Sequence, residues 1–144
     1  MKQLSLVGRV LFSLVFLAAA PGHFQAGTIA YAAAQGVPLA SLAVPASGVL
    51  ALLGALSVIL GYRTRWGAAA LVAFLVPVTF SMHAFWAVSD PMLRQLQMAM
   101  FMKNAALIGA ALTLMASGAG AYSLDARAEA RRGAPAGRVV GEAA

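Results

Sequence analysis

Four polar side chains stand in otherwise apolar stretches of this sequence and are the first candidates for chemistry. His23 and His83 are the only histidines, and Lys103 with Asn104 interrupts an apolar run. Imidazole, ammonium and carboxamide groups can each donate a hydrogen bond to a carbonyl oxygen. Polar groups inside a membrane span usually face a bundle interior or a cavity, because exposing them to lipid is costly. We therefore expect these residues to form a polar pocket for the head of an apolar ligand.

Each of these residues also has an ordinary structural explanation when it is taken alone. A lysine near a membrane boundary can extend its ammonium to the headgroups. An asparagine in a span often bonds a neighbouring helix. The pocket hypothesis depends on the coincidence of these residues at one depth. It also includes Thr79, which shares a helical face with His83 at the i, i+4 spacing, and Trp86, which would stack beside the ligand.

Four apolar segments approach or reach the roughly 20 residues that a helix needs to cross a bilayer. They are residues 4–20, 39–60, 66–85 and 97–121. A count of about 20 residues from the cytoplasmic end of a span ends near His23 in the first, near Phe85 in the third and at about Lys103 in the fourth. The sequence thus predicts an all-α fold, a four-transmembrane-helix bundle with two imidazoles and one amine at similar depth near its outer face.

Basic residues predict the orientation of this bundle. Most of them lie before or early in the first span, between the second and third, or after the fourth, which places both termini in the cytoplasm. Residues 25–35 are rich in alanine and are followed by Gly36 and Pro38, which predicts a short external helix between spans one and two. Residues 1–122 are expected to form the membrane domain, and residues 123–144 a disordered cytoplasmic tail. The first span has one alternative, a cleaved signal peptide, because small residues follow its apolar run.

Composition supports a membrane protein and excludes several kinds of chemistry. Of the 144 residues, 62% are hydrophobic and only 10% are charged, and the mean hydropathy is +0.85. The chain has no cysteine, which excludes disulfides, thiol redox chemistry and c-type haem attachment. The net charge of +6 comes from basic residues next to apolar segments, so we expect contact with lipid headgroups and no binding of nucleic acid.

Several short motifs in order resemble the DoxX family of small four-helix membrane proteins. They are AGTIAYAAAQGVP at 26–38, GYRTR at 61–65, TFSMHAFW at 79–86 and FMKNAALIGA at 101–110. The resemblance covers residues 8–116, which is nearly the whole membrane portion. One position departs from the family pattern: Ala51 stands where members commonly carry a glutamate in the second span. Lys103 would then lack an intramembrane acidic partner.

The resemblance implies a redox-associated, quinone-linked subunit in a bacterial plasma membrane, since the family takes its name from a subunit of a thiosulfate:quinone oxidoreductase. No covalent or metal cofactor is expected, and a quinone is the candidate ligand. The partner would be a redox subunit or a second copy of the chain. The alternative is a non-catalytic interaction or assembly subunit, in which the polar residues only order the bundle. Met98 with Met102 as a Cu(I) site, or the two histidines as haem ligands, are weaker hypotheses because such pairs are common.

Overall fold

The computed structural model describes residues 2–133, and every regular element in this range is helical. The elements in chain order are α1 (Lys2–Ala19), the 3₁₀ turn η1 (Ala20–Phe24), α2 (Ala26–Ala34), α3 (Ala40–Leu60), α4 (Thr64–Met82), the 3₁₀ turn η2 (Phe85–Ala87), α5 (Pro91–Ser117) and α6 (Leu124–Gly133). Four segments are long and apolar enough to cross a membrane: Gln3–Phe24, Ala40–Leu60, Thr64–Ala87 and Pro91–Ser117. The predicted fold class is confirmed, including the short helix between the first two spans.

Local sequence explains where these helices begin and end. Asp90 starts α5 as its N-cap, since its Oδ1 accepts a hydrogen bond of 2.7 Å from the backbone N–H of Leu93, and Pro91 follows at the first helical position. Gly61 ends α3 with φ of +66°, and Gly36 follows α2 with φ of +81°. Both glycines take a left-handed conformation that a side chain disfavours.

Small residues let α3 and α4 approach each other closely. A Cβ added at Gly54 would lie 2.9 Å from the side chain of Leu71 and 3.0 Å from the carbonyl oxygen of Gly67, so the two backbones nearly touch there. In lipid, such close packing has to replace the hydrophobic effect that holds soluble helices together. The buried core around this crossing consists of Phe12, Phe16, Ala51, Ala55, Val58, Ala68, Leu71, Phe74, Leu75 and Ala111.

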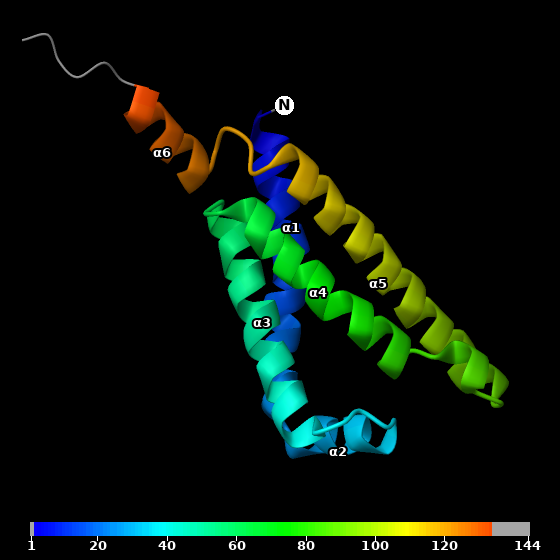
Figure 1. The fold of residues 1–144 in the computed structure, drawn as a ribbon. Coiled ribbons are helices and arrows are strands. Elements are labelled where there is room, and N and C mark those ends of the chain that lie inside the picture. Colours follow the sequence, from blue (N-terminus) through cyan, green and yellow to red (C-terminus); the bar gives the residue numbers. More distant parts are fainter. Residues whose placement is uncertain (1, 134–144) are drawn as a thin grey trace, which may run out of the picture.

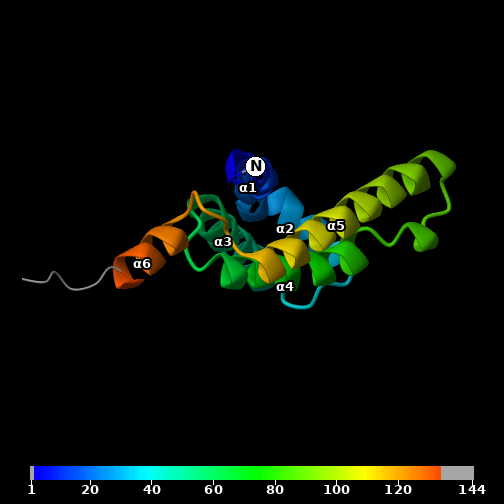
Figure 2. The ribbon, with the colours of Figure 1, turned by 90° about the horizontal axis from the view of Figure 1, so that it is seen from above.

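The helices α3 and α4 share the tight turn at Gly61 and separate towards their other ends (Figure 1). Helix α2 lies across the end at which they separate, and it is anchored by Ala32, which packs with Ala40 and Val44 at the start of α3. Viewed from above, α5 runs along α4 and away from α1 (Figure 2).

The fourth span and the C-terminal tail differ from their predicted boundaries, and the fourth span ends at Ser117 rather than at residue 121. The fourth span begins at Pro91 rather than at residue 97, because the Asp90–Pro91 pair starts the helix earlier. The tail predicted to be disordered from residue 123 instead forms α6 over Leu124–Gly133, while residues 134–144 lie outside the described range. Ser123 caps α6, since its hydroxyl oxygen accepts a hydrogen bond of 3.1 Å from the backbone N–H of Ala126.

Candidate functional site

A cavity of about 550 Å³ occupies the space between α2, α3 and α4. Its wall is mostly apolar and includes Leu50, Ala73, Phe74 and Pro77 from the interiors of two spans. The polar side chains that line it are His23, Thr28, Tyr31, Ser47, Ser81, His83 and Gln97. The two histidines, from the first and third spans, therefore meet in one cavity at the end of the molecule where α2 lies.

His23 is held in place by contacts on three sides. Its Nδ1 lies 3.2 Å from the backbone carbonyl oxygen of Ala19, one turn earlier. Its ring meets the ring of Phe74 edge-on, with 5.4 Å between the centroids. On α3, position 48 is a glycine, and a Cβ added there would lie 2.5 Å from the Cβ of His23. The backbone of α3 thus packs directly against this histidine.

His83 belongs to a short chain of polar groups that the sequence did not predict. Its Nδ1 lies 2.8 Å from Oε1 of Gln97, and Nε2 of Gln97 donates a longer hydrogen bond of 3.5 Å to the hydroxyl of Tyr31. Tyr31 is 45% exposed, whereas His83 and Gln97 are half-buried. The chain therefore links the cavity to the outer surface of α2. A glutamine six residues before the polar Lys103–Asn104 pair gave no distinctive signal in the sequence.

Thr79 and Asn104 are buried, but neither lines the cavity. The hydroxyl of Thr79 donates a hydrogen bond of 2.6 Å to the backbone carbonyl of Leu75, so its hydrogen is used within α4. Asn104 is 5% exposed and lies on the face of α5 that packs against α4. That face carries Gln97, Phe101, Asn104, Ile108 and Ala111, which recur at helical spacing. Both residues contribute to helix packing.

Lys103 does not join the histidines, and the prediction that it opens the fourth span at the outer boundary is wrong. Helix α5 starts at Pro91, so Lys103 lies near the midpoint of its 27 residues. Its neighbour Asn104 points towards α4, and successive residues of an α-helix are rotated by about 100°, which turns Lys103 away from that contact. The side chain of Lys103 is exposed. Gln97, and not Lys103, is the residue of α5 that reaches the cavity.

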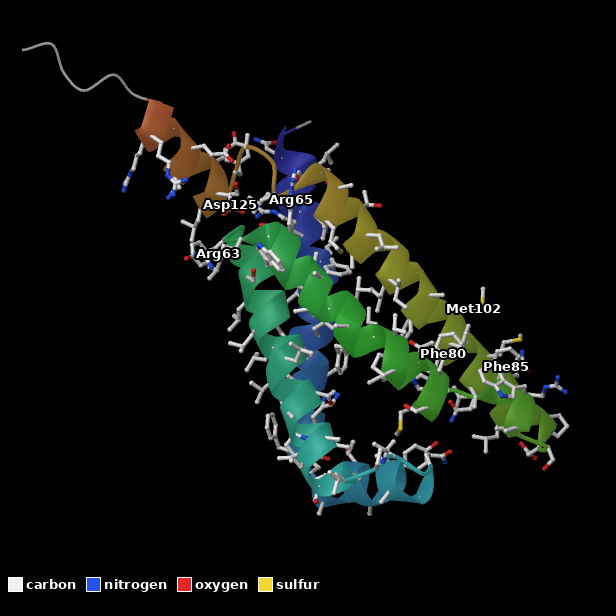
Figure 3. The ribbon with its side chains drawn as sticks, viewed as in Figure 1. Arg63, Arg65, Phe80, Phe85, Met102 and Asp125 are labelled. Carbon is white, nitrogen blue, oxygen red and sulfur yellow. The ribbon has the colours of Figure 1, made fainter. Side chains whose placement is uncertain are left out.

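Trp86 lies in an aromatic cluster beside the cavity and outside its wall. Its ring is 54% exposed and contacts Phe80, Phe85 and Phe101, with centroid separations between 5.1 and 6.4 Å. This cluster joins the end of α4 to α5, and Figure 3 shows Phe80 and Phe85 on that side. The expected stacking of Trp86 on a ligand in the cavity is therefore replaced by packing within the protein.

A second polar arrangement lies at the opposite end of the molecule, and we call it the turn clamp: Arg9, Gly61, Arg63, Thr64 and Asp125. Asp125 accepts hydrogen bonds from the backbone N–H groups of Arg63 (2.7 Å) and Thr64 (3.1 Å) and from the Thr64 hydroxyl (3.2 Å). The backbone N–H of Asp125 in turn donates to the carbonyl of Gly61 at 2.8 Å. Figure 3 shows Asp125 beside this turn. The carboxylate thus caps α4 from a helix 61 residues away in the sequence.

Arg9 ties α1 to the turn clamp. Although it is charged, its side chain is only 1% exposed, and it donates hydrogen bonds to the backbone carbonyls of Val58 and Tyr122. Burial alone would raise the pKa of Asp125, but the hydrogen bonds from Thr64 and Arg63 and the positive charge of Arg9 outweigh it, and the pKa lies below its ordinary value. This carboxylate therefore stays charged opposite the guanidinium.

Comparisons with known proteins agree with this architecture. The sequence profile of the DoxX family matches residues 4–84. The chain is 34% identical over 122 residues to "Inner membrane protein YqjF" of Escherichia coli (strain K12), which covers 83% of this chain and 88% of that protein. It is 29% identical over 126 residues to "Inner membrane protein YphA" of the same organism, covering 86% and 89% of the two chains. No solved structure matches the chain.

Proposed function

The chain belongs to the DoxX family, and from this premise we propose that it is a redox-associated, multi-pass inner-membrane protein whose cavity binds a quinone. The observation that carries the proposal is the cavity of about 550 Å³, which combines a mostly apolar wall with two imidazoles. Small-molecule sites typically have volumes of about 300–1,000 Å³ and a few polar groups in an apolar lining. A quinone has the matching distribution of polarity, since two carbonyl oxygens sit on an otherwise apolar ring and tail.

In this proposal the residues of the cavity have distinct roles. His23 and His83 would lie beside the oxygen-bearing edge of the ring, and Leu50 with Phe74 would pack against its apolar parts. A bound quinone supplies two-electron, two-proton redox chemistry. The Tyr31–Gln97–His83 chain would hold a proton at Nδ1 of His83 and connect it to the exposed hydroxyl of Tyr31.

Extraction of the purified protein tests this function. Protein purified from its membrane in mild detergent is extracted with organic solvent, and quinones are measured by chromatography. We expect near-stoichiometric quinone in the wild type and at least a tenfold loss in His83→Leu. Lys103→Ala is the matched control, because Lys103 does not line the cavity. Wild-type protein that carries no quinone and takes up none when it is added would contradict the proposal.

We also propose that both termini face the cytoplasm. Arg63 and Arg65 lie at the α3–α4 turn, Arg9 donates a hydrogen bond to Val58 beside this turn, and Arg127 and Arg131 belong to α6. Figure 1 shows that the turn and α6 lie at the end of the molecule opposite α2. Positive side chains favour the cytoplasmic side. Because the chain has no cysteine, single cysteines can report the orientation directly. In intact spheroplasts, a membrane-impermeant maleimide should label Gln35→Cys and leave Ala128→Cys unlabelled, and the reverse pattern would contradict this orientation.

One observation favours the second candidate function, a non-catalytic assembly subunit. Only 11% of the apolar window of α5 is buried, against 28% to 33% in the other three spans. A span with so little cover can pack against a partner redox subunit or a second copy of this chain. Native mass spectrometry of the detergent-purified protein distinguishes the two functions. A protein that carries a stoichiometric partner and never a quinone would support assembly alone.

A further inference from the structure

The hydrogen-bonding polarity of His23 is fixed by the protein. Its Nδ1 lies 3.2 Å from the carbonyl oxygen of Ala19, and a carbonyl oxygen only accepts hydrogen bonds. Nδ1 must therefore carry the ring proton and donate it. A neutral imidazole has one such proton, so Nε2 of His23 is left with a lone pair. Because His23 lines the cavity, a ligand that reaches Nε2 of neutral His23 meets a hydrogen-bond acceptor and no donor.

Gly48 leaves room for the imidazole of His23 and so keeps its Nε2 in position. The Cβ of His23 and its Cγ lie 2.5 Å and 3.1 Å from where a side chain at position 48 would begin. Any larger residue at this point of α3 would push the imidazole out of its position against Ala19 and Phe74. Gly48 is therefore a positioning residue for His23, even though it has no side chain of its own.

The hydrogen-bonding polarity of His83 can change, whereas that of His23 is fixed. Gln97 offers both a carbonyl oxygen and an amide NH₂, and the hydroxyl of Tyr31 can donate or accept. In the structure, Oε1 of Gln97 faces Nδ1 of His83, which makes Nδ1 the donor and Nε2 an acceptor. Rotation of the amide by 180° would satisfy the same groups with the opposite polarity. The cavity thus has a fixed hydrogen-bond acceptor at His23. At His83, Nε2 can accept or donate a hydrogen bond, depending on the orientation of the Gln97 amide.

We propose that this cavity selects a ligand that donates a hydrogen bond, so that it binds the hydroxyl-bearing quinol in preference to the quinone; this rests on the proposed function. A quinone carries only carbonyl acceptors, and its oxygen would face the lone pair of His23 without a hydrogen atom between them. A quinol has the same ring with hydroxyl donors in the same places. Losing one buried hydrogen bond corresponds to roughly a 10- to 100-fold difference in affinity.

Matched ligands test the preference on the unaltered protein. The full-length wild type in lipid nanodiscs is titrated anaerobically at pH 8 with decylubiquinol, with decylubiquinone and with the dimethyl ether of decylubiquinol, which lacks both hydroxyl donors. We expect the quinol to bind about 10- to 100-fold more tightly than the other two ligands. If the quinone or the dimethyl ether binds as tightly as the quinol, the selection is refuted while the proposed function stands. If none of the three binds, the proposed function fails as well.

Two variants test whether His23 is the source of the preference. His23→Phe keeps an aromatic ring against Phe74 but removes the acceptor, and Gly48→Ala displaces the imidazole. Both should bring the ratio of quinol to quinone affinity close to one, which a merely structural role would not do. Gly109→Ala is the control, because nothing lies within 4 Å of a Cβ at that position, and it should keep the wild-type ratio. A preference that persists in His23→Phe would overturn the assignment.

Discussion

Removing the carboxylate of Asp125 should destabilise the protein more than removing any other acidic side chain of α6. Asp125 caps α4 through the N–H groups of Arg63 and Thr64, and loss of an N-cap costs about 0.5–2 kcal/mol. It is also the acid whose charge interacts with the buried guanidinium of Arg9. Because Asp125 is partly exposed, solvent screening limits this second contribution to about 1 kcal/mol. We expect Asp125→Ala to lower the free energy of unfolding by about 1.5–3 kcal/mol.

The assay is an SDS titration in mixed micelles at pH 7, followed by circular dichroism. Glu129→Ala is the matched control, since it removes an exposed carboxylate one turn further along α6 and should change stability by less than about 0.5 kcal/mol. Equal unfolding midpoints for Asp125→Ala and Glu129→Ala would refute the role of the turn clamp.

The same carboxylate predicts how stability depends on pH. The pKa of Asp125 is lower in the folded protein than its ordinary value of 3.8, so the unfolded chain binds more protons on acidification. The stability from Asp125 is therefore fully present above about pH 4–5 and is lost as the pH falls through the lowered folded-state pKa. The chain has only four acidic residues, which makes this effect easy to attribute. The difference in the free energy of unfolding between the wild type and Asp125→Asn should shrink as the pH falls from 5 to 2. A difference that stays constant over this range would contradict the linkage.

Gly61→Ala should lower the thermal stability in detergent far more than Gly109→Ala. Gly61 has φ of +66° and a Cβ added there would overlap the side chain of Arg9, whereas a Cβ at position 109 meets nothing within 4 Å. Equal melting temperatures of the two variants would argue against this packing. Phe101→Ala should cost about 1–3 kcal/mol in the SDS titration, since its ring meets three aromatic rings with centroids 5.5–5.8 Å away, and an unchanged midpoint would exclude a stabilising cluster. Asp90→Ala should cost about 1 kcal/mol and fray the start of α5, which hydrogen exchange at Leu93 would detect as faster exchange.

The sequence was sufficient for the helices themselves. Backbone groups in lipid must be satisfied within a segment, so a long apolar run has few alternatives to an α-helix. Local signals also fixed the short helix at Ala26–Ala34, whose end is followed by Gly36 in the left-handed conformation. A local signal was also present at the start of the fourth span, where Asp90 and Pro91 form a cap. The prediction placed the start of that span at residue 97 because it followed hydropathy alone.

The depth of a residue in the membrane could be estimated by counting along the sequence, but the direction in which its side chain points from the helix could not. His23 and His83 were expected at similar depth, and the structure brings both to one cavity. Lys103 was expected beside them, yet the face of α5 that meets α4 carries Gln97 and Asn104 instead. The rotation of a helix about its own axis is set by how its surface fits its neighbour, which the apolar character of the run does not encode.

By itself, the sequence determined the number and order of the spans and the separation of most basic residues towards one end, because these follow from local hydropathy and charge. Only the tertiary structure decided that Gln97 joins Tyr31 to His83, that Gly48 supports His23, and that Asp125 caps a helix begun by Thr64. Such contacts join residues that are 14 to more than 60 positions apart. They depend on how closely, and at what angle, the helices meet, and the small residues at the α3–α4 crossing allow the close approach.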